Sequence, residues 1–251
     1  MRSARRWTRL AAGILLVLAS STMARAAETV DLQLVLLVDV SLSVDEGRYR
    51  LQRDGTAAAF ANPALVAAIK AGAAGAISVA MLEFSDTDKQ AVVVDWTRIA
   101  SAADAGALAN KIRGLKRSSA GLTGIGNALL AARDLFDHSP YQADRRVIDL
   151  SGDGLANVGP PVWQVRDTLV DDGITINGLP IMTEEPALEV YYREYIIGGP
   201  NAFVIPAQGL ASFAQAMQMK LLAEVAFLDS ASLDPDLLNR ATTVGHARAA
   251  H

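Results

Sequence analysis

Residues 34–43, with the sequence LVLLVDVSLS, constrain the fold more than any other stretch of the chain. Residues 34–39 predict a strand without a hydrophilic face, which is typical of the middle of a sheet covered on both sides. The run ends in Asp39, Ser41 and Ser43, so a carboxylate and two hydroxyls follow a buried strand directly. Because an unpaired carboxylate is costly to bury, the pattern predicts a partner for Asp39, and a divalent cation is the obvious candidate.

Segments with strand and helix patterns alternate along the rest of the chain. Further strands are expected at 77–84, 91–96, 145–150 and 174–181, with a short last strand at 203–205. Helices are expected at 45–61, 64–71, 97–115, 123–136, 163–171 and 209–227. This order predicts a doubly wound α/β fold, in which helices cover both faces of a mainly parallel central sheet. The polar turn at 85–90 adds one antiparallel strand at the edge of that sheet.

The first 26 residues have the pattern of a secretory signal peptide. Four arginines precede an apolar run at 10–19, and Ala24-Arg25-Ala26 supplies small residues at a cleavage point. The alternative is an uncleaved membrane anchor, but the run is short for a membrane span. We therefore expect export to the bacterial periplasm or beyond, one domain over residues 27–228, and a loose C-terminal tail at 229–251.

Composition excludes several classes of function. The 23 Lys and Arg, less the five of the signal segment, stand against 27 Asp and Glu and leave a net charge of −9. A chain so acidic, with no concentrated basic patch, is not expected to bind nucleic acid or an anionic membrane surface. The absence of cysteine from the sequence excludes disulfides, thiolate metal sites and a cysteine nucleophile.

Two further oxygen-bearing residues fall at the ends of predicted elements. Thr123 opens a helix, and Asp153 follows the strand at 145–150 in the sequence SGDG. Ligands of parallel sheets bind at the carboxyl ends of the strands, so we expect both residues to lie near Asp39, Ser41 and Ser43. All five side chains offer hard oxygen, which suits Mg²⁺, with Mn²⁺ or Ca²⁺ as alternatives, and disfavours zinc.

Each of these residues also has a simpler interpretation. Ser43 could cap the helix at 45–61, Thr123 could cap its own helix, and Asp153 could belong to an Asp-Gly turn. Asp149 interrupts an apolar strand, and it could either support the site from behind or pair with Arg145, Arg146 or a backbone group. It is not included in the predicted ligand set.

The three motifs together resemble a known family. Asp39-x-Ser41-x-Ser43, Thr123 in TGIGNAL and Asp153 in SGDG are similar, in this order, to the metal-ion-dependent adhesion site (MIDAS) of a von Willebrand factor type A (vWA) domain. More narrowly, residues 147–154, 174–181, 191–192 and 198–203 resemble a poorly characterised family of exported bacterial proteins with this Rossmann-like fold.

The resemblance implies a specific set of roles. Ser41 and Ser43 would bind the ion directly, Asp39 and Asp153 largely through water, and Thr123 in either way. An open coordination position would take an Asp or Glu carboxylate from a protein partner. The predicted function is thus a non-enzymatic, metal-dependent adhesion module, with the insertion at 182–200 supplying specificity.

Two alternatives belong to other classes of protein. One is a metal-assisted hydrolase that uses the same ion as a Lewis acid, and the other is a structural vWA domain without ligand binding. His138, His246 and His251 lie far apart in the sequence, and no pair of residues has the spacing of a general base with its partner, which argues against the hydrolase.

Overall fold

The centre of the molecule is a five-stranded sheet with the order β4-β3-β2-β6-β7. The computed structural model describes residues 27–183 and 185–226, so the predicted signal peptide and C-terminal tail lie outside the described residues. Four strands are parallel: β2 (Leu32–Asp39), β3 (Ile77–Ser85), β6 (Arg146–Gly152) and β7 (Ile174–Pro180). The edge strand β4 (Lys89–Ile99) runs antiparallel to β3. The predicted sheet is confirmed.

Strand β2 occupies the middle of this sheet, and all eight of its residues are buried. Leu34, Leu36 and Val38 contribute to one hydrophobic core, whereas Val35 and Leu37 contribute to a second core on the opposite face. Side chains of a strand point alternately to its two faces, so a strand without a hydrophilic face needs cover on both sides.

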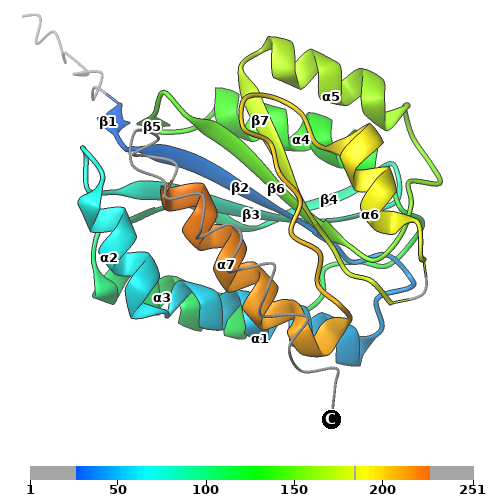
Figure 1. Ribbon diagram of the computed structural model, residues 1–251, viewed down its shortest axis with the longest axis horizontal. Helices are drawn as coiled ribbons and strands as arrows, with labels where there is room; N and C mark the ends of the chain where they lie inside the picture. The colour runs from blue at the N-terminus through cyan, green and yellow to red at the C-terminus, as the bar shows by residue number, and fades with distance from the viewer. Residues whose placement is uncertain (1–26, 184, 227–251) are drawn as a thin grey trace, which may run out of the picture.

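Helices provide that cover in two layers (Figure 1). One layer comprises α1 (Glu46–Phe60), α2 (Pro63–Ala71), α3 (Ala102–Arg113) and α7 (Phe213–Ala226). The other comprises α4 (Ile125–Asp137), α5 (Val162–Asp171) and the short α6 (Leu188–Tyr191), which continues as a π-helical turn at Tyr192–Ile196. Helices on both faces are therefore confirmed, and none within the described ranges is long and apolar enough to cross a membrane.

The junction between β4 and α3 differs from the sequence prediction. The helix expected from residue 97 is wrong at its start, because β4 runs on to Ile99, which is buried and pairs with Ile77. Helix α3 begins only after Ser101, whose hydroxyl accepts the N–H of Asp104.

The strand expected at 203–205 is reduced to isolated bridges. Val204 pairs with Gly178 and Ala207 with Ile181, both beside β7. Pro206 lies between the two bridges and has no N–H to donate to a ladder. The helix expected from 209 opens with a 3₁₀ turn at Leu210–Ser212 before α7.

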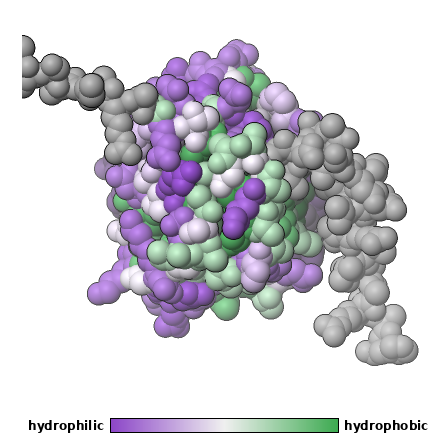
Figure 2. All heavy atoms as spheres, turned by 90° about the vertical axis from the view of Figure 1, so that its left-hand side faces the viewer, coloured by the Kyte–Doolittle hydropathy of each residue, from purple (hydrophilic) through white to green (hydrophobic). Residues whose placement is uncertain are grey.

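The amino ends of the parallel strands lie at the edge of the molecule that carries the short β1 (Glu28–Thr29), β5 (Tyr141–Gln142) and α2 (Figure 1). Figure 2 shows hydrophilic and weakly hydrophobic side chains interspersed over this edge. The carboxyl ends, where Asp39 and Asp153 lie, form the opposite edge.

Candidate metal centre

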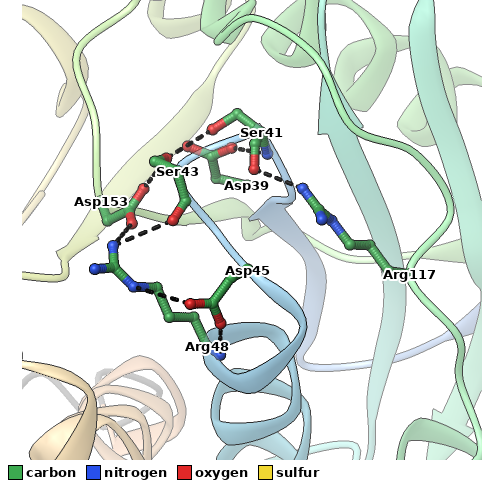
Figure 3. A network of polar contacts seen from close by, with 7 residues as sticks. All are labelled: Asp39, Ser41, Ser43, Asp45, Arg48, Arg117 and Asp153. Carbon is green, nitrogen blue, oxygen red and sulfur yellow. Dashed lines mark hydrogen bonds and ion pairs between the residues drawn. The ribbon is translucent and has the colours of Figure 1, made fainter.

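Three chain segments bring the predicted ligands to the carboxyl edge of the sheet. Asp39 is the last residue of β2, and Asp153 directly follows the neighbouring β6. Thr123 lies two residues before α4 begins. Figure 3 shows the side chains of Asp39, Ser41, Ser43 and Asp153 gathered together, with Arg48 and Arg117 approaching from either side.

Asp39 is a buried carboxylate with one oxygen unsatisfied. Asp39 is 1% exposed, and its Oδ1 accepts the N–H of Ser41 at 2.7 Å. Its Oδ2 is buried and has no hydrogen-bond partner among the described residues. Burial raises the pKa of Asp39 to about 7, against the lowering effect of its hydrogen bonds with Ser41. A buried carboxylate oxygen of this kind is a natural ligand for a cation.

The backbone N–H of Ser41 and the two serine hydroxyls connect Asp39 to Asp153. Ser41 Oγ lies 3.2 Å from Ser43 Oγ, and Ser43 Oγ donates to Asp153 Oδ1 at 2.6 Å. Four of the five predicted side chains therefore form one continuous polar network.

Thr123 is 5% exposed and lies beside the loop that follows Asp153. Its N–H donates to Asn157 Oδ1 at 2.8 Å, and its carbonyl accepts the N–H of Asn157 at 3.1 Å. A Cβ added to Gly154 would lie 3.8 Å from Thr123 Oγ1, so the hydroxyl faces the backbone next to Asp153.

The capping interpretations of Ser43 and Thr123 are wrong. Asp45 caps α1, because its carboxylate accepts the N–H of Arg48 at 2.8 Å. The capping position of α4 is Gly124, where no side chain makes a cap hydrogen bond. Asp153 lies in a turn, but its carboxylate is engaged by Ser43 and Arg48.

Sequence reasoning missed two arginines at this edge. Arg117 Nη2 donates to the carbonyls of Val40 and Ser41, at 2.7 Å each, and so fixes the loop that carries both serines. Arg48 Nη1 lies 3.2 Å from Asp153 Oδ2 and 3.2 Å from the carbonyl of Ser43. Arg48 could have been predicted, because it lies in the first turn of the helix that follows Ser43. No sequence pattern connects Arg117 to this site.

Asp149 belongs to a different network. Lys220 on α7 lies 2.8 Å from Asp149 Oδ1 and 3.0 Å from Glu224 Oε1, and Asn177 Nδ2 donates to the same Glu224 oxygen at 2.7 Å. Of the alternatives for Asp149, an ion pair is found, but its partner is Lys220 and not Arg145 or Arg146, because the packing of α7 against the sheet supplies a buried lysine. Burial raises the pKa of Asp149 to about 6, and the charge of Lys220 opposes this rise.

The donor set fits a hard divalent cation. Asp39, Ser41, Ser43 and Asp153 lie in one polar network, Thr123 lies beside the loop that follows Asp153, and Asp39 Oδ2 is buried without a partner among the described residues. Over the ranges that the structure describes, no cluster of three or more His, Cys, Asp or Glu could hold a metal. An ion at this edge would therefore depend on hydroxyl ligands, as the sequence pattern predicts.

A cavity of about 370 Å³ adjoins this edge. The loop 156–161 and the start of α5 form one wall, and Tyr191 and Tyr195 form another. The two tyrosine rings stack with centroids 5.3 Å apart, and Trp163 at the rim is 46% exposed. Asn157 both lines the cavity and bonds to Thr123, which links the cavity to the candidate metal centre.

Comparisons with known proteins give a consistent fold. Residues 29–229 match the sequence model of a family described as a protein of unknown function, DUF1194. No curated protein matches the chain. Among solved structures, it is similar to proximal thread matrix protein 1 from the mussel byssus, with a TM-score of 0.60 and 18% identity over 78% of this chain and 48% of that one. That mussel protein has also been solved with a zinc-occupied MIDAS motif.

Two bacterial structures share the same architecture. A von Willebrand factor type A protein from Catenulispora acidiphila has a TM-score of 0.55 and 18% identity over 79% of this chain and 43% of its own. The vWF domain of the type V pili tip protein Mfa5 from Porphyromonas gingivalis has a TM-score of 0.55 and 15% identity over 83% of this chain and 99% of its own. The chain spans about half the length, or less, of the mussel and Catenulispora proteins. The likeness confirms the vWA fold.

Proposed function

Because this chain belongs to the DUF1194 family and has the von Willebrand factor type A fold, we propose that it is a metal-dependent protein-binding module. The observation that carries this proposal is the buried, unpartnered Oδ2 of Asp39 at the centre of an all-oxygen cluster. A carboxylate buried there without a cation destabilises the fold, and ligand binding best accounts for its position at a strand end.

Five residues would hold the ion: Asp39, Ser41, Ser43, Thr123 and Asp153. Their oxygens suit Mg²⁺, with Mn²⁺ or Ca²⁺ as alternatives, and the zinc-occupied MIDAS of the mussel protein supports a divalent cation in general. When bound, the ion would supply an electron-poor centre for an anionic ligand. The three hydroxyls carry no charge, and carboxylates that act largely through water would leave the ion electron-poor, so a further anionic donor is favourable.

The ligand in this proposal is an Asp or Glu carboxylate on a protein partner. The similar structures include a pili tip protein and a thread matrix protein, which supports protein binding as the general role. The insertion at 182–200 would supply specificity, since Tyr191 and Tyr195 line the cavity beside the candidate centre. A partner side chain next to the bound carboxylate would enter that cavity. The signal-like pattern of residues 1–26 supports a function in the periplasm or outside the cell.

The surroundings of the site favour binding over hydrolysis. His138 follows the last residue of α4, at the end opposite to Thr123. With about 1.5 Å of rise per residue, a helix of this length puts some 20 Å between the two residues. Ser43 is engaged by Asp153 and has no histidine or lysine bonded to it among the described residues. These contacts supply no activated nucleophile.

A thermal-shift titration tests the proposal. We expect Mg²⁺ or Mn²⁺ to raise the Tm of the exported chain and Asp39→Ala to abolish the shift. Asp54→Asn is the matched control, because Asp54 is an exposed carboxylate of α1 that pairs with Arg53 instead of with a predicted ligand. Equal shifts in the wild type and in Asp39→Ala would remove the metal assignment. A pull-down from the parent cell envelope with and without EDTA then tests whether the ion bridges to a partner.

A further inference from the structure

The guanidinium of Arg48 lies where the candidate metal centre meets solvent. It approaches Asp153 from the first turn of α1, with Nη1 3.2 Å from Asp153 Oδ2 and 3.2 Å from the carbonyl of Ser43 (Figure 3). The side chain of Asp153 is only 3% exposed, whereas that of Arg48 is 24% exposed. The chain thus places a cation of its own against one of the predicted carboxylate ligands.

Local structure holds Arg48 in this position. Asp45 caps α1 by accepting the backbone N–H of Arg48 at 2.8 Å, and its other oxygen lies 3.9 Å from Arg48 Nε. The guanidinium therefore lies between the carboxylates of Asp45 and Asp153, and the helix start fixes the backbone from which it extends.

This arrangement leaves Asp153 fully engaged. Its Oδ1 accepts the Ser43 hydroxyl at 2.6 Å, and its Oδ2 faces Arg48. A divalent ion bound through Ser43 would compete for the electron density of the same carboxylate, and it would carry two positive charges close to the guanidinium. Such a pair of like charges weakens ion binding.

Arg117 differs from Arg48 in what it can do. Its guanidinium is bonded to the carbonyls of Val40 and Ser41, which belong to the loop itself. It therefore stabilises the loop whether or not an ion is present. Arg48, which is partly exposed and bonded to a predicted ligand, is the arginine whose contacts an ion would change.

We propose that Arg48 is a positioning residue that competes with the divalent ion for Asp153 and so sets the ion affinity of the site. This inference rests on the proposed function, since it concerns the same ion. In the absence of the ion, Arg48 neutralises Asp153 and keeps the ligand loop assembled. When the ion binds, the guanidinium releases the Asp153 carboxylate. The site then has excess positive charge, which favours an acidic ligand.

The test measures binding of Mn²⁺ alone by calorimetry to the wild type, Arg48→Gln, Arg50→Gln and Asp39→Ala. We expect Arg48→Gln to bind the ion about ten-fold more tightly than the wild type, the order expected for removing one charge near a divalent ion. Arg50 lies on the same helix and is exposed, so Arg50→Gln removes the same charge and should leave the affinity unchanged. Circular dichroism without ion checks that each variant is folded.

The outcomes separate the two proposals. If the wild type binds Mn²⁺, Asp39→Ala does not, and Arg48→Gln binds no more tightly than the wild type, the role of Arg48 is overturned and the metal site stands. If neither the wild type nor Arg48→Gln binds Mn²⁺, the proposed function fails with it. A second measurement is made on the wild type and is informative even if Arg48→Gln does not fold. The NMR signal of the Arg48 guanidinium, identified by its loss in Arg48→Lys, should move on addition of Mg²⁺. An unmoved signal in an ion-loaded protein contradicts the proposal.

Discussion

Replacing Asp39 with asparagine should stabilise the ion-free protein while it removes the response to ions. The pKa of Asp39 is raised from 3.8 to about 7, chiefly by burial. Between these values the folded state holds a proton that the unfolded state has lost, so the free energy of unfolding falls as the pH rises from about 4 to about 7 and is level above that. At about 1.4 kcal/mol for each pKa unit, the ionised Asp39 costs about 4 kcal/mol at pH 8.

Asparagine at position 39 removes the cost of burying a charge but adds the smaller cost of an unsatisfied amide group. Its carbonyl oxygen can accept the N–H of Ser41 as Oδ1 does now, at 2.7 Å. Its amide group then replaces Oδ2, which has no partner in the described part of the chain, and an unsatisfied buried donor costs about 1–3 kcal/mol. The difference leaves Asp39→Asn more stable than the wild type by about 2 kcal/mol at pH 8, or about 4–8 °C in Tm for a domain of this size.

The assay is urea unfolding with EDTA at pH values from 4 to 8. The stability gain of Asp39→Asn should shrink toward pH 4, because the folded state then holds Asp39 protonated and the unfolded state begins to take up the same proton. The pH response of Asp149 is common to both proteins and cancels. Mg²⁺ should stabilise only the wild type. Asp45→Asn, at an exposed helix cap, should stay within about 0.5 kcal/mol of the wild type. An Asp39→Asn protein less stable than the wild type at pH 8, or a difference independent of pH, would refute the reasoning.

Two further predictions concern features outside the ligand set. Lys220→Met leaves Asp149 and Glu224 buried without their cation, so it should lower the free energy of unfolding in urea by about 3–5 kcal/mol at pH 8. The loss should be smaller at pH 5, where Asp149 can take up a proton. An equal loss at both pH values would contradict this account. Trp163→Ala, at the exposed rim of the cavity, should change the free energy of unfolding by less than about 1 kcal/mol and leave ion-induced Tm shifts intact while reducing retention of a partner in the envelope pull-down. Undiminished retention of the partner would show that the cavity is not part of the binding surface.

The candidate site illustrates which features a sequence can reveal. Asp39 and Asp153 were assigned to the same edge because parallel neighbouring strands end together, and β2 and β6 are indeed adjacent and parallel. The continuous apolar run at 34–39 predicts a fully buried strand, and in the structure β2 covers Leu32–Asp39 with all eight residues buried. The start of α3 was misplaced because the alanine-rich stretch has a helical period, whereas pairing of Ile99 with Ile77 extends β4 instead.

The fold class and the five oxygen-bearing residues of the proposed metal site are predictable from the sequence alone, because they follow from periodicity and from the polar residues at strand ends and at a helix start. The contacts of the charged side chains, by contrast, depend on the tertiary structure. Arg48 meets Asp153 across 105 residues, Arg117 meets Val40 across 77, and Lys220 reaches Asp149 from a helix near the end of the described chain. Such pairings have no local pattern, since they depend on how helices pack against the sheet and on which cation that packing brings to each buried carboxylate.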